Sequence, residues 1–219
     1  MIQVLEADSI WLEYAGQKIL QSIYLKIETG KIVGLLGRNG TGKSSLLRMI
    51  FGTLRGQNQS IRINGNHISH PYLAKNLIRY LPQHNFVPPY LKLEELCGIY
   101  EVSFSKMADY FPELHAFEKQ KIGALSGGNR RLVETLLILL SPVSFILLDE
   151  PFTHLAPVTA EQLSMVIMEQ KKQKGILVSD HSYRQVLDLS DDVYLIVPVG
   201  RSILLKNPEQ ELQLLGYTR

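Results

Sequence analysis

The hydrophobic and polar positions of the N-terminal part predict several short strands, followed by one buried strand and a helix. Residues Val4–Glu6, Ile10–Tyr14 and Ile23–Ile27 show the short alternation of half-buried β-strands. Ile32–Leu36 is a continuous apolar run that ends at a glycine, which is typical of a strand covered on both faces. In Lys43–Phe51 the apolar side chains recur at helical spacing. A buried strand that runs into a helix therefore opens the predicted core.

The remainder of the chain continues this alternation of strands and helices, with one interruption. Short apolar segments predict further strands, and helical spacing separates some of them: the strands are Ile61–Ile63, Leu77–Leu81, Phe145–Leu148, Ile176–Val178 and Tyr194–Val197, and the helices lie near Leu91–Tyr100, Ser105–Phe111 and Leu132–Leu140. Apolar strands that alternate with helices predict an α/β core with a mostly parallel sheet. The helical stretch that follows His84 departs from this order, so we interpret it as a small helical subdomain inserted into the core.

Composition limits the class of protein and of partner. The chain has 219 residues, 45% of them hydrophobic, which fits one large domain, and its formal net charge of +2 argues against a nucleic-acid partner. The single cysteine, Cys97, excludes an internal disulfide and is expected to be a buried small hydrophobe. No apolar stretch reaches the ~20 residues of a membrane-spanning helix, and the N-terminus carries no secretory signal. We expect a cytoplasmic protein that meets a membrane only through a partner.

The first candidate chemistry is the segment Gly37–Ser44, which matches the phosphate-binding pattern G-x-x-x-x-G-K-[ST] between a predicted strand and a predicted helix. Its glycines free the backbone to turn N–H groups inward, and the helix that follows adds the positive end of its dipole. Lys43 is placed to reach the β- and γ-phosphates, and Ser44 to reach Mg²⁺. The predicted ATP-binding residues of this loop are Gly37, Arg38, Asn39, Gly40, Thr41, Gly42, Lys43, Ser44 and Ser45. A glycine-rich turn with a chance lysine is the alternative, and the loop alone does not separate kinases, GTPases and ATPases.

Two carboxylates follow a second buried strand. Asp149 and Glu150 come directly after the apolar run that starts at Phe145. Ligands bind at the C-terminal end of such strands in open α/β sheets. Asp149 is therefore expected to hold Mg²⁺ directly or through water, and Glu150 to act as the general base for the attacking water. A strand that simply ends in solvated acids is the alternative.

The discriminating segment is Leu125–Asn129, which reads LSGGN. It resembles the LSGGQ signature of the ATP-binding cassette (ABC) proteins, with an asparagine in place of the usual glutamine. In that family the signature of one subunit binds the γ-phosphate of ATP held by the other, which implies this role in trans for Ser126, Gly127, Gly128 and Asn129. A flexible turn is the alternative, although a glycine turn that leads into a helix also makes an anion site.

Further landmarks occur in the order that this family has. Tyr14 resembles the aromatic that stacks on adenine, and Gln83 resembles the glutamine that touches Mg²⁺ and senses the membrane partner. His181 resembles the switch histidine that contacts the γ-phosphate, and residues 200–212 resemble the closing hairpin and helix. Taken singly, Tyr14 reads as an ordinary strand aromatic, Gln83 as a loop amide and His181 as a structural or surface histidine. The order of all of them together carries the resemblance, which covers nearly the whole chain.

The resemblance implies a fold and an activity. The fold is an α/β P-loop NTPase core with a mostly parallel sheet, an N-terminal antiparallel β subdomain and a small helical subdomain at approximately 84–140, all within one domain, 1–219. The activity is hydrolysis of ATP with Mg²⁺ as cofactor. The implied catalytic residues are Lys43, Glu150 and His181, the implied Mg²⁺ ligands are Ser44, Gln83 and Asp149, and Tyr14 joins the loop in binding ATP.

The implied partners are a second ABC subunit and a membrane protein. We expect a homodimer, or a pair with another ABC subunit, to form when ATP binds, and integral membrane transporter subunits to dock near Phe86–Tyr90. That would place the protein on the cytoplasmic face of the membrane. Packing of Phe86–Tyr90 against the helical subdomain is the alternative. Two other function classes stay open: a non-transport ABC ATPase that acts on ribosomes or DNA, and a nucleotide-sensing regulatory subunit.

Two departures from the family bear on these expectations. Ala156 stands where the family has an aspartate that helps to link the two ATP sites across the dimer, so the departure affects coupling between sites. The segment from Gln83 to Ser126 is short for the family, so we expect a small helical subdomain with a reduced or reshaped docking groove.

Overall fold

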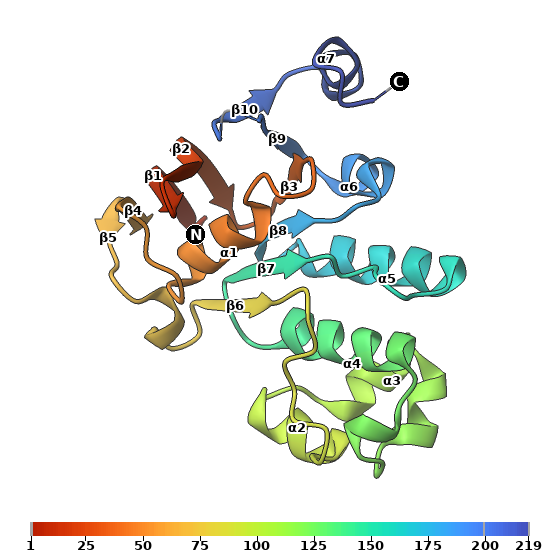
Figure 1. Cartoon of the computed structure of the whole chain (residues 1–219). Helices are drawn as coiled ribbons and strands as arrows, with labels where there is room; N and C mark the ends of the chain where they lie inside the picture. The colour runs from red at the N-terminus through yellow and green to blue at the C-terminus, as the bar shows by residue number, and fades with distance from the viewer. Residues whose placement is uncertain (1, 199, 219) are drawn as a thin grey trace.

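The computed structural model, which describes residues 2–198 and 200–218, places the strands in two sheets (Figure 1). The first sheet is antiparallel and has the order β2-β1-β4-β5. Its strands are β1 (Val4–Tyr14), β2 (Gln17–Glu28), β4 (Asn58–Ile63) and β5 (Asn66–His67). This sheet is the antiparallel N-terminal subdomain that the resemblance implies.

The second sheet has the order β10-β9-β3-β8-β7-β6 and is parallel except for the edge strand β10. Its strands are β3 (Ile32–Gly37), β6 (Ile78–Leu81), β7 (Phe145–Asp149), β8 (Gly175–Ser179), β9 (Asp192–Ile196) and β10 (Ser202–Leu205). The mostly parallel sheet is thus confirmed. The central strands β3, β7 and β8 are buried along their whole length, as their continuous apolar runs predict.

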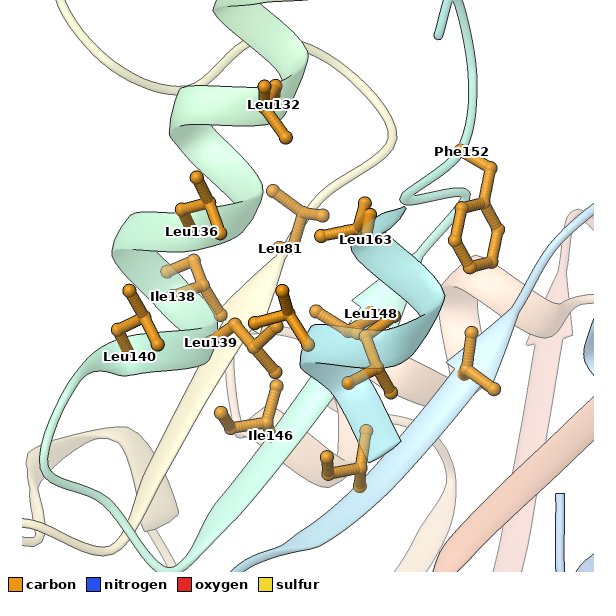
Figure 2. Close-up of a cluster of buried hydrophobic side chains, with 14 of the residues drawn as sticks. Leu81, Leu132, Leu136, Ile138, Leu139, Leu140, Ile146, Leu148, Phe152 and Leu163 are labelled. Atoms are coloured by element: carbon orange, nitrogen blue, oxygen red, sulfur yellow. The ribbon is translucent and has the colours of Figure 1, made fainter. Parts of the chain in front are cut away.

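Helices cover both faces of this sheet. Along β7 alternate side chains enter different clusters: Phe145 and Leu147 pack toward α1 and the antiparallel sheet, whereas Ile146 and Leu148 pack toward α4 and α5. Figure 2 shows the second cluster, in which leucines of α4 meet Leu81, Leu148 and Leu163. The helices are α1 (Lys43–Phe51), α2 (Leu93–Ile99), α3 (Phe104–Tyr110), α4 (Gly127–Leu140), α5 (Pro157–Gln170), α6 (Tyr183–Leu189) and α7 (Pro208–Leu214).

The segment between β6 and β7 is helical apart from its connecting turns. It contains α2, α3, the short 3₁₀ helices η2 (Pro112–Phe117) and η3 (Ile122–Ala124), and α4, and a further 3₁₀ helix, η1 (Pro71–Leu73), precedes β6. In Figure 1, α2 and α3 lie at the end of the molecule away from the antiparallel sheet. Cys97 is buried within α2, and burial raises the pKa of its thiol to about 11, which suits a packing role.

Three local features differ from the hydrophobic pattern. The two strands predicted at residues 4–6 and 10–14 form one strand, β1. Its pairing with β2 continues through a bulge between Ala7 and Ile10, where the register shifts and Ser9 has φ 55°. Helices α5 and α6 were not predicted. In α5 the apolar side chains of Val158, Met165 and Met168 are exposed, which blurs the helical period, and α6 has only seven residues.

In the part of the chain that the structure describes, no helix is long and apolar enough to cross a membrane.

Candidate functional site

The loop between β3 and α1 owes its shape to glycine in two different ways. Gly40 and Gly42 have φ values of 79° and 94°, in the left-handed region, and Gly42 is the N-cap of α1. Gly37 is different from what we expected, because its φ is not positive. A Cβ at Gly37 would lie 2.6 Å from the Thr41 Oγ1, so close approach explains this glycine.

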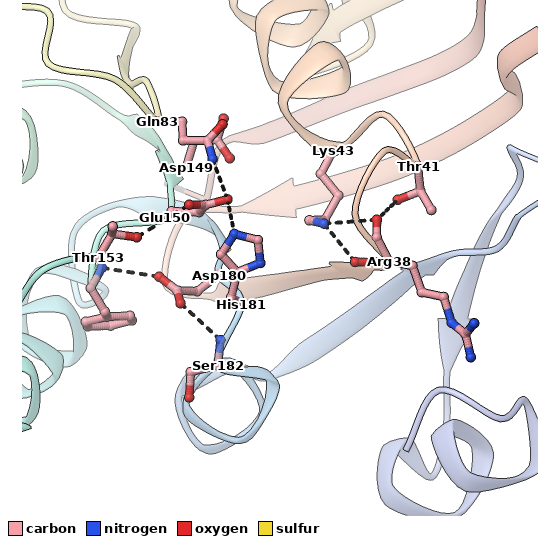
Figure 3. Close-up of polar contacts among 12 residues, drawn as sticks. Arg38, Thr41, Lys43, Gln83, Asp149, Glu150, Thr153, Asp180, His181 and Ser182 are labelled. Carbon is pink, nitrogen blue, oxygen red and sulfur yellow. Dashed lines mark hydrogen bonds and ion pairs between the residues drawn. The ribbon is translucent and has the colours of Figure 1, made fainter. Parts of the chain in front are cut away.

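Side chains of the loop also hold its form. The Thr41 hydroxyl donates to the carbonyl of Arg38 at 2.8 Å, and the Arg38 guanidinium turns away to donate to the carbonyl of Gly216 at 2.7 Å. The Lys43 ammonium donates to the carbonyls of Gly37 and Arg38 at 2.7 and 3.3 Å (Figure 3). Burial lowers the pKa of Lys43, and the nearby carboxylates, Glu150 first, oppose that shift. The loop thus keeps a buried ammonium at its centre.

A cavity of about 510 Å³ opens over this loop, and it gathers residues from distant parts of the sequence. It is lined by Tyr14, Ile19, Asn39, Gly40, Gly42, Lys43, Ser44, Ser45, Gln83, Glu150 and His181. Gly37, Arg38, Thr41 and Asp149 were predicted site residues but do not line it. Ile19 was missed because it belongs to no motif, and its side chain lies 2.8 Å from where a Cβ of Gly42 would stand.

Tyr14, the last residue of β1, is 51% exposed. Its ring lines the cavity and stays outside the sheet's core. An aromatic in this position is free to stack on a base, which a buried strand aromatic is not.

Asp149 ends β7, and the hydroxyls of Tyr80 and Ser44 lie near its carboxylate. The Tyr80 hydroxyl donates to Asp149 Oδ2 at 3.1 Å, whereas Asp149 Oδ1 is buried without a hydrogen-bond partner among the described residues. Burial raises the pKa of Asp149, and the nearby Ser44 and Tyr80 hydroxyls act in the opposite sense. Asp149 therefore offers one oxygen for a cation.

The carboxylate of Glu150 contacts two other predicted site residues, Gln83 and His181. Its Oε1 accepts from the Gln83 amide at 3.0 Å and lies 2.8 Å from the Nε2 of His181. Figure 3 shows both side chains directed at this carboxylate. The backbone of Glu150 has φ 55°, a strained value for a residue with a side chain, and its N–H donates to the carbonyl of Ser179 at 2.6 Å. Strain of this kind persists only where surrounding contacts enforce it.

A buried guanidinium supplies much of that enforcement, and the motifs did not reveal it. Arg131 of α4 is 3% exposed. It donates to the carbonyl of Glu150 at 3.2 and 2.9 Å, to that of Pro82 at 2.7 Å, and to that of Asp149. Arg131 therefore ties the N-terminal part of α4 to the ends of β6 and β7. Its pattern in the sequence, an arginine after the signature, carries no signal for this role.

The signature segment forms the start of α4. The Ser126 hydroxyl accepts from the N–H of Asn129 at 3.2 Å, as an N-cap does. Ser126 and Gly127 are exposed, and Gly128 backs onto His154, whose carbonyl would lie 2.8 Å from an added Cβ. Ser126–Asn129 do not line the cavity of their own chain. An exposed signature outside that cavity has the placement that binding in trans would need.

Ala156, which stands where the resemblance implies an aspartate, is also exposed. Ala156 is the N-cap of α5, and its methyl side chain cannot accept a hydrogen bond from the first backbone N–H groups of the helix. Ala156 is thus the point where this chain lacks a carboxylate that a helix start favours.

The residues fit Mg²⁺ provided that a nucleotide supplies further ligands. Across residues 2–198 and 200–218, no three His, Cys, Asp or Glu side chains gather in a way that could hold a metal by themselves. Mg²⁺ is commonly bound by one or two carboxylates together with phosphates and water. The unpartnered Asp149 Oδ1 and the Ser44 hydroxyl at the cavity match that donor set.

Comparisons with known proteins agree on one family. The sequence model of the family described as "ABC transporter" matches residues 20–153. The lipopolysaccharide export system ATP-binding protein LptB of Haemophilus influenzae is 31% identical, over 95% of this chain and 92% of its own. A probable branched-chain amino acid transport ATP-binding protein, LivF of Archaeoglobus fulgidus, is 33% identical over 84% of each chain.

Solved structures agree on the fold. The ATP-binding subunit of an ABC transporter superposes with a TM-score of 0.82 at 24% identity, covering 97% of this chain and 95% of that one. An ABC-transporter cassette in its ADP conformation superposes with a TM-score of 0.76 at 22% identity, covering 98% and 95%.

Proposed function

The chain belongs to the ABC transporter family of ATP-binding proteins, and from that premise we propose that it hydrolyses ATP to power substrate movement through separate membrane subunits. The observation that carries the proposal is the single cavity in which Lys43, Glu150 and His181 converge from the loop, the end of β7 and the end of β8. A cation for phosphate, a carboxylate for water and a histidine at the cavity are the parts that phosphoryl transfer to water needs.

Nucleotide binding follows from the residues that line the cavity. The backbone N–H groups of residues 37–45 and the start of α1 would receive the phosphates, with Lys43 on the β- and γ-phosphates. Tyr14 would stack on the adenine ring at the cavity's exposed side. Ser44, Asp149 and Gln83 would hold Mg²⁺, which when bound neutralises phosphate charge and orients the γ-phosphate.

Glu150 would act on the attacking water. Its carboxylate takes a proton from the water as the oxygen bonds to the γ-phosphorus. The bond between that phosphorus and the β,γ-bridging oxygen breaks, so ADP and inorganic phosphate result. His181 and Gln83 hold this carboxylate. With ATP present, His181 would turn to the γ-phosphate, for which its half-exposed ring has room.

Dimerisation would complete the site. We expect two copies, or this chain and a paired ABC subunit, to enclose ATP between the loop of one and Ser126–Asn129 of the other, with two-fold symmetry. The γ-phosphate would join the two halves, so its removal would open them. ATP thereby favours the closed state over the open one, which is the differential affinity that a switch requires.

The docking segment near Gln83 divides into buried and exposed parts. The ring of Phe86 packs on Tyr100 with centroids 6.2 Å apart, and Val87 is buried, as packing against the helical subdomain predicts. Pro88, Pro89 and Tyr90 are exposed, with Tyr90 at 68%. We propose residues 88–90 as the part that meets an integral membrane subunit on the cytoplasmic face, because all three are exposed whereas Phe86 is half-buried and Val87 is buried.

Replacement of Lys43 tests the hydrolytic part. Lys43→Ala should greatly weaken ATP binding and abolish turnover, because it removes the positive charge placed among the loop carbonyls. Nucleotide affinity and phosphate release would be measured beside Lys75→Ala, an exposed lysine outside the cavity. Wild-type turnover in Lys43→Ala would contradict the assignment of the loop.

Capture of the partner tests the transport part. Affinity purification of the full chain from native membranes, with Tyr90→Glu as the paired variant, should recover an integral membrane protein with the wild type only. Equal recovery with Tyr90→Glu would contradict docking at residues 88–90. If both the wild type and Tyr90→Glu recover ribosomes or DNA, the result would favour a non-transport ABC ATPase.

A further inference from the structure

Tyr80 does not line the cavity, but it contacts the carboxylate of Asp149, to which we assign Mg²⁺ binding. It is the third residue of β6, where it pairs with Leu147 of the parallel strand β7. Its hydroxyl donates to the Oδ2 of Asp149, the last residue of β7, at 3.1 Å. No part of the phosphate loop, the acidic pair or the signature includes Tyr80, so its role is not contained in those motifs.

The ring of Tyr80 is held by aromatic packing. Its centroid lies 5.6 Å from that of Phe51, the last residue of α1, and the ring of Tyr72 lies 5.9 Å from the same Phe51. The packing on Phe51 therefore fixes the ring of Tyr80, and its hydroxyl is a fixed donor to the Asp149 carboxylate.

The two oxygens of Asp149 differ because of this donor. Oδ2 is engaged by Tyr80, whereas Oδ1 is buried and has no hydrogen-bond partner in residues 2–198 and 200–218. When a hydrogen bond holds one oxygen of a carboxylate, it fixes the orientation of the carboxylate plane. The position of the other oxygen is then fixed as well. Mg²⁺ requires near-ideal octahedral geometry, so the direction of each ligand matters more for it than for larger cations.

We propose that Tyr80 is a positioning residue that pins Asp149 Oδ2 and thereby presents Oδ1 as a single-oxygen ligand for Mg²⁺. The inference rests on the proposed function, because it takes Asp149 as the metal ligand. Loss of a partner that orients a metal ligand commonly weakens metal binding or activity by about 10- to 100-fold.

The test is the variant Tyr80→Phe, with Tyr72→Phe as its matched control. Both remove one hydroxyl from a ring packed on Phe51, but Tyr72 is 37% exposed and only Tyr80 bonds to Asp149. The dissociation constant of ATP would be measured with excess EDTA and with saturating Mg²⁺. The constant in EDTA divided by the constant in Mg²⁺ reports how much the metal strengthens ATP binding. The wild type and Tyr72→Phe should share one ratio.

In Tyr80→Phe the ratio should fall by about 10-fold or more, while the constant in EDTA stays at the wild-type value. The Mg²⁺ concentration for half-maximal turnover should rise in step. A ratio equal to that of the wild type would overturn the inference. Equal weakening with EDTA and with Mg²⁺, or a collapsed melting temperature, would show a structural role and overturn it too. If ATP binding and turnover of the wild type do not depend on Mg²⁺, the assignment of Asp149 as a Mg²⁺ ligand is overturned instead.

Discussion

Replacing Arg131 by methionine should loosen Glu150, the proposed catalytic carboxylate, and leave the phosphate-binding loop unchanged. Methionine keeps much of the length and fills apolar space, but it donates no hydrogen bonds. The carbonyls of Pro82, Asp149 and Glu150 would each lose a donor that they have in the wild type. Glu150, which has φ 55°, would lose the contact that holds its carbonyl in place.

The size of the effect follows from these contacts. A buried carbonyl left without a partner costs about 1–3 kcal/mol, so three of them set an upper range near ~9 kcal/mol. Removing a guanidinium from the interior relieves its desolvation, and relaxing Glu150 recovers about 1–3 kcal/mol of backbone strain. We expect a net loss of about 2–5 kcal/mol in the free energy of unfolding. For a chain of this size that lowers the melting temperature by roughly 5–15 °C.

The assay pairs thermal unfolding with single-turnover hydrolysis. Misplacing a reacting group by ~1 Å costs about 100-fold in rate, so the hydrolysis step should slow to that extent, while ATP affinity stays near the wild-type value. Arg131→Lys retains a charge but loses the fork, so it should recover only part of both properties. A melting temperature and a hydrolysis rate equal to those of the wild type in Arg131→Met would refute the reasoning.

Three further perturbations have defined outcomes. Tyr14→Ala should weaken ATP affinity by roughly 1–3 kcal/mol if the ring stacks on adenine, and an unchanged dissociation constant would return Tyr14 to an ordinary strand aromatic. Burial lowers the pKa of Lys174 from 10.5 to about 8, with a smaller contribution from Lys106. Between those values the unfolded chain binds the proton that the folded chain lacks, so urea unfolding should show the wild type gaining stability over Lys174→Met as pH rises from 8 to 10; a constant difference would contradict the shift. Ala156→Asp should stabilise α5 by about 0.5–2 kcal/mol as an N-cap, and an unchanged or lower melting temperature would count against that cap.

Local motifs predicted the residues whose chemistry depends on their sequence neighbours. The loop from Gly37, the acids after β7 and the turn before α4 each combine a strand or helix end with its functional side chains, so a short pattern contains both. Tyr80 and Arg131 could not be found in this way. Tyr80 meets Asp149 because β6 and β7 pair in parallel, and Arg131 meets Pro82 because α4 packs against β6. Such contacts are set by the tertiary fold.

The hydrophobic pattern likewise predicted the elements whose burial shows in their own residues, and missed those that depend on tertiary contacts. Runs such as Ile32–Leu36 are buried on both faces, so their apolar character alone identified them as strands. Helix α5 packs Leu163 and Ile167 inward but leaves Met165 and Met168 exposed, so no single apolar face marks it. The bulge at Ser9 likewise depends on pairing with β2, which the order of residues in β1 does not show.

The most direct test of the account is the oligomeric state of Glu150→Gln in the presence of ATP. Glutamine keeps the size of Glu150 and its hydrogen bonding but cannot take a proton, so ATP should bind and persist. Size-exclusion chromatography over a range of protein concentrations should then show a dimer with ATP and Mg²⁺ that is absent with ADP. Ser126→Arg, added as the control, should abolish the dimer and leave ATP binding to the monomer largely intact. A monomer at every concentration with saturating ATP and Mg²⁺, or hydrolysis by Glu150→Gln at the wild-type rate, would contradict the account.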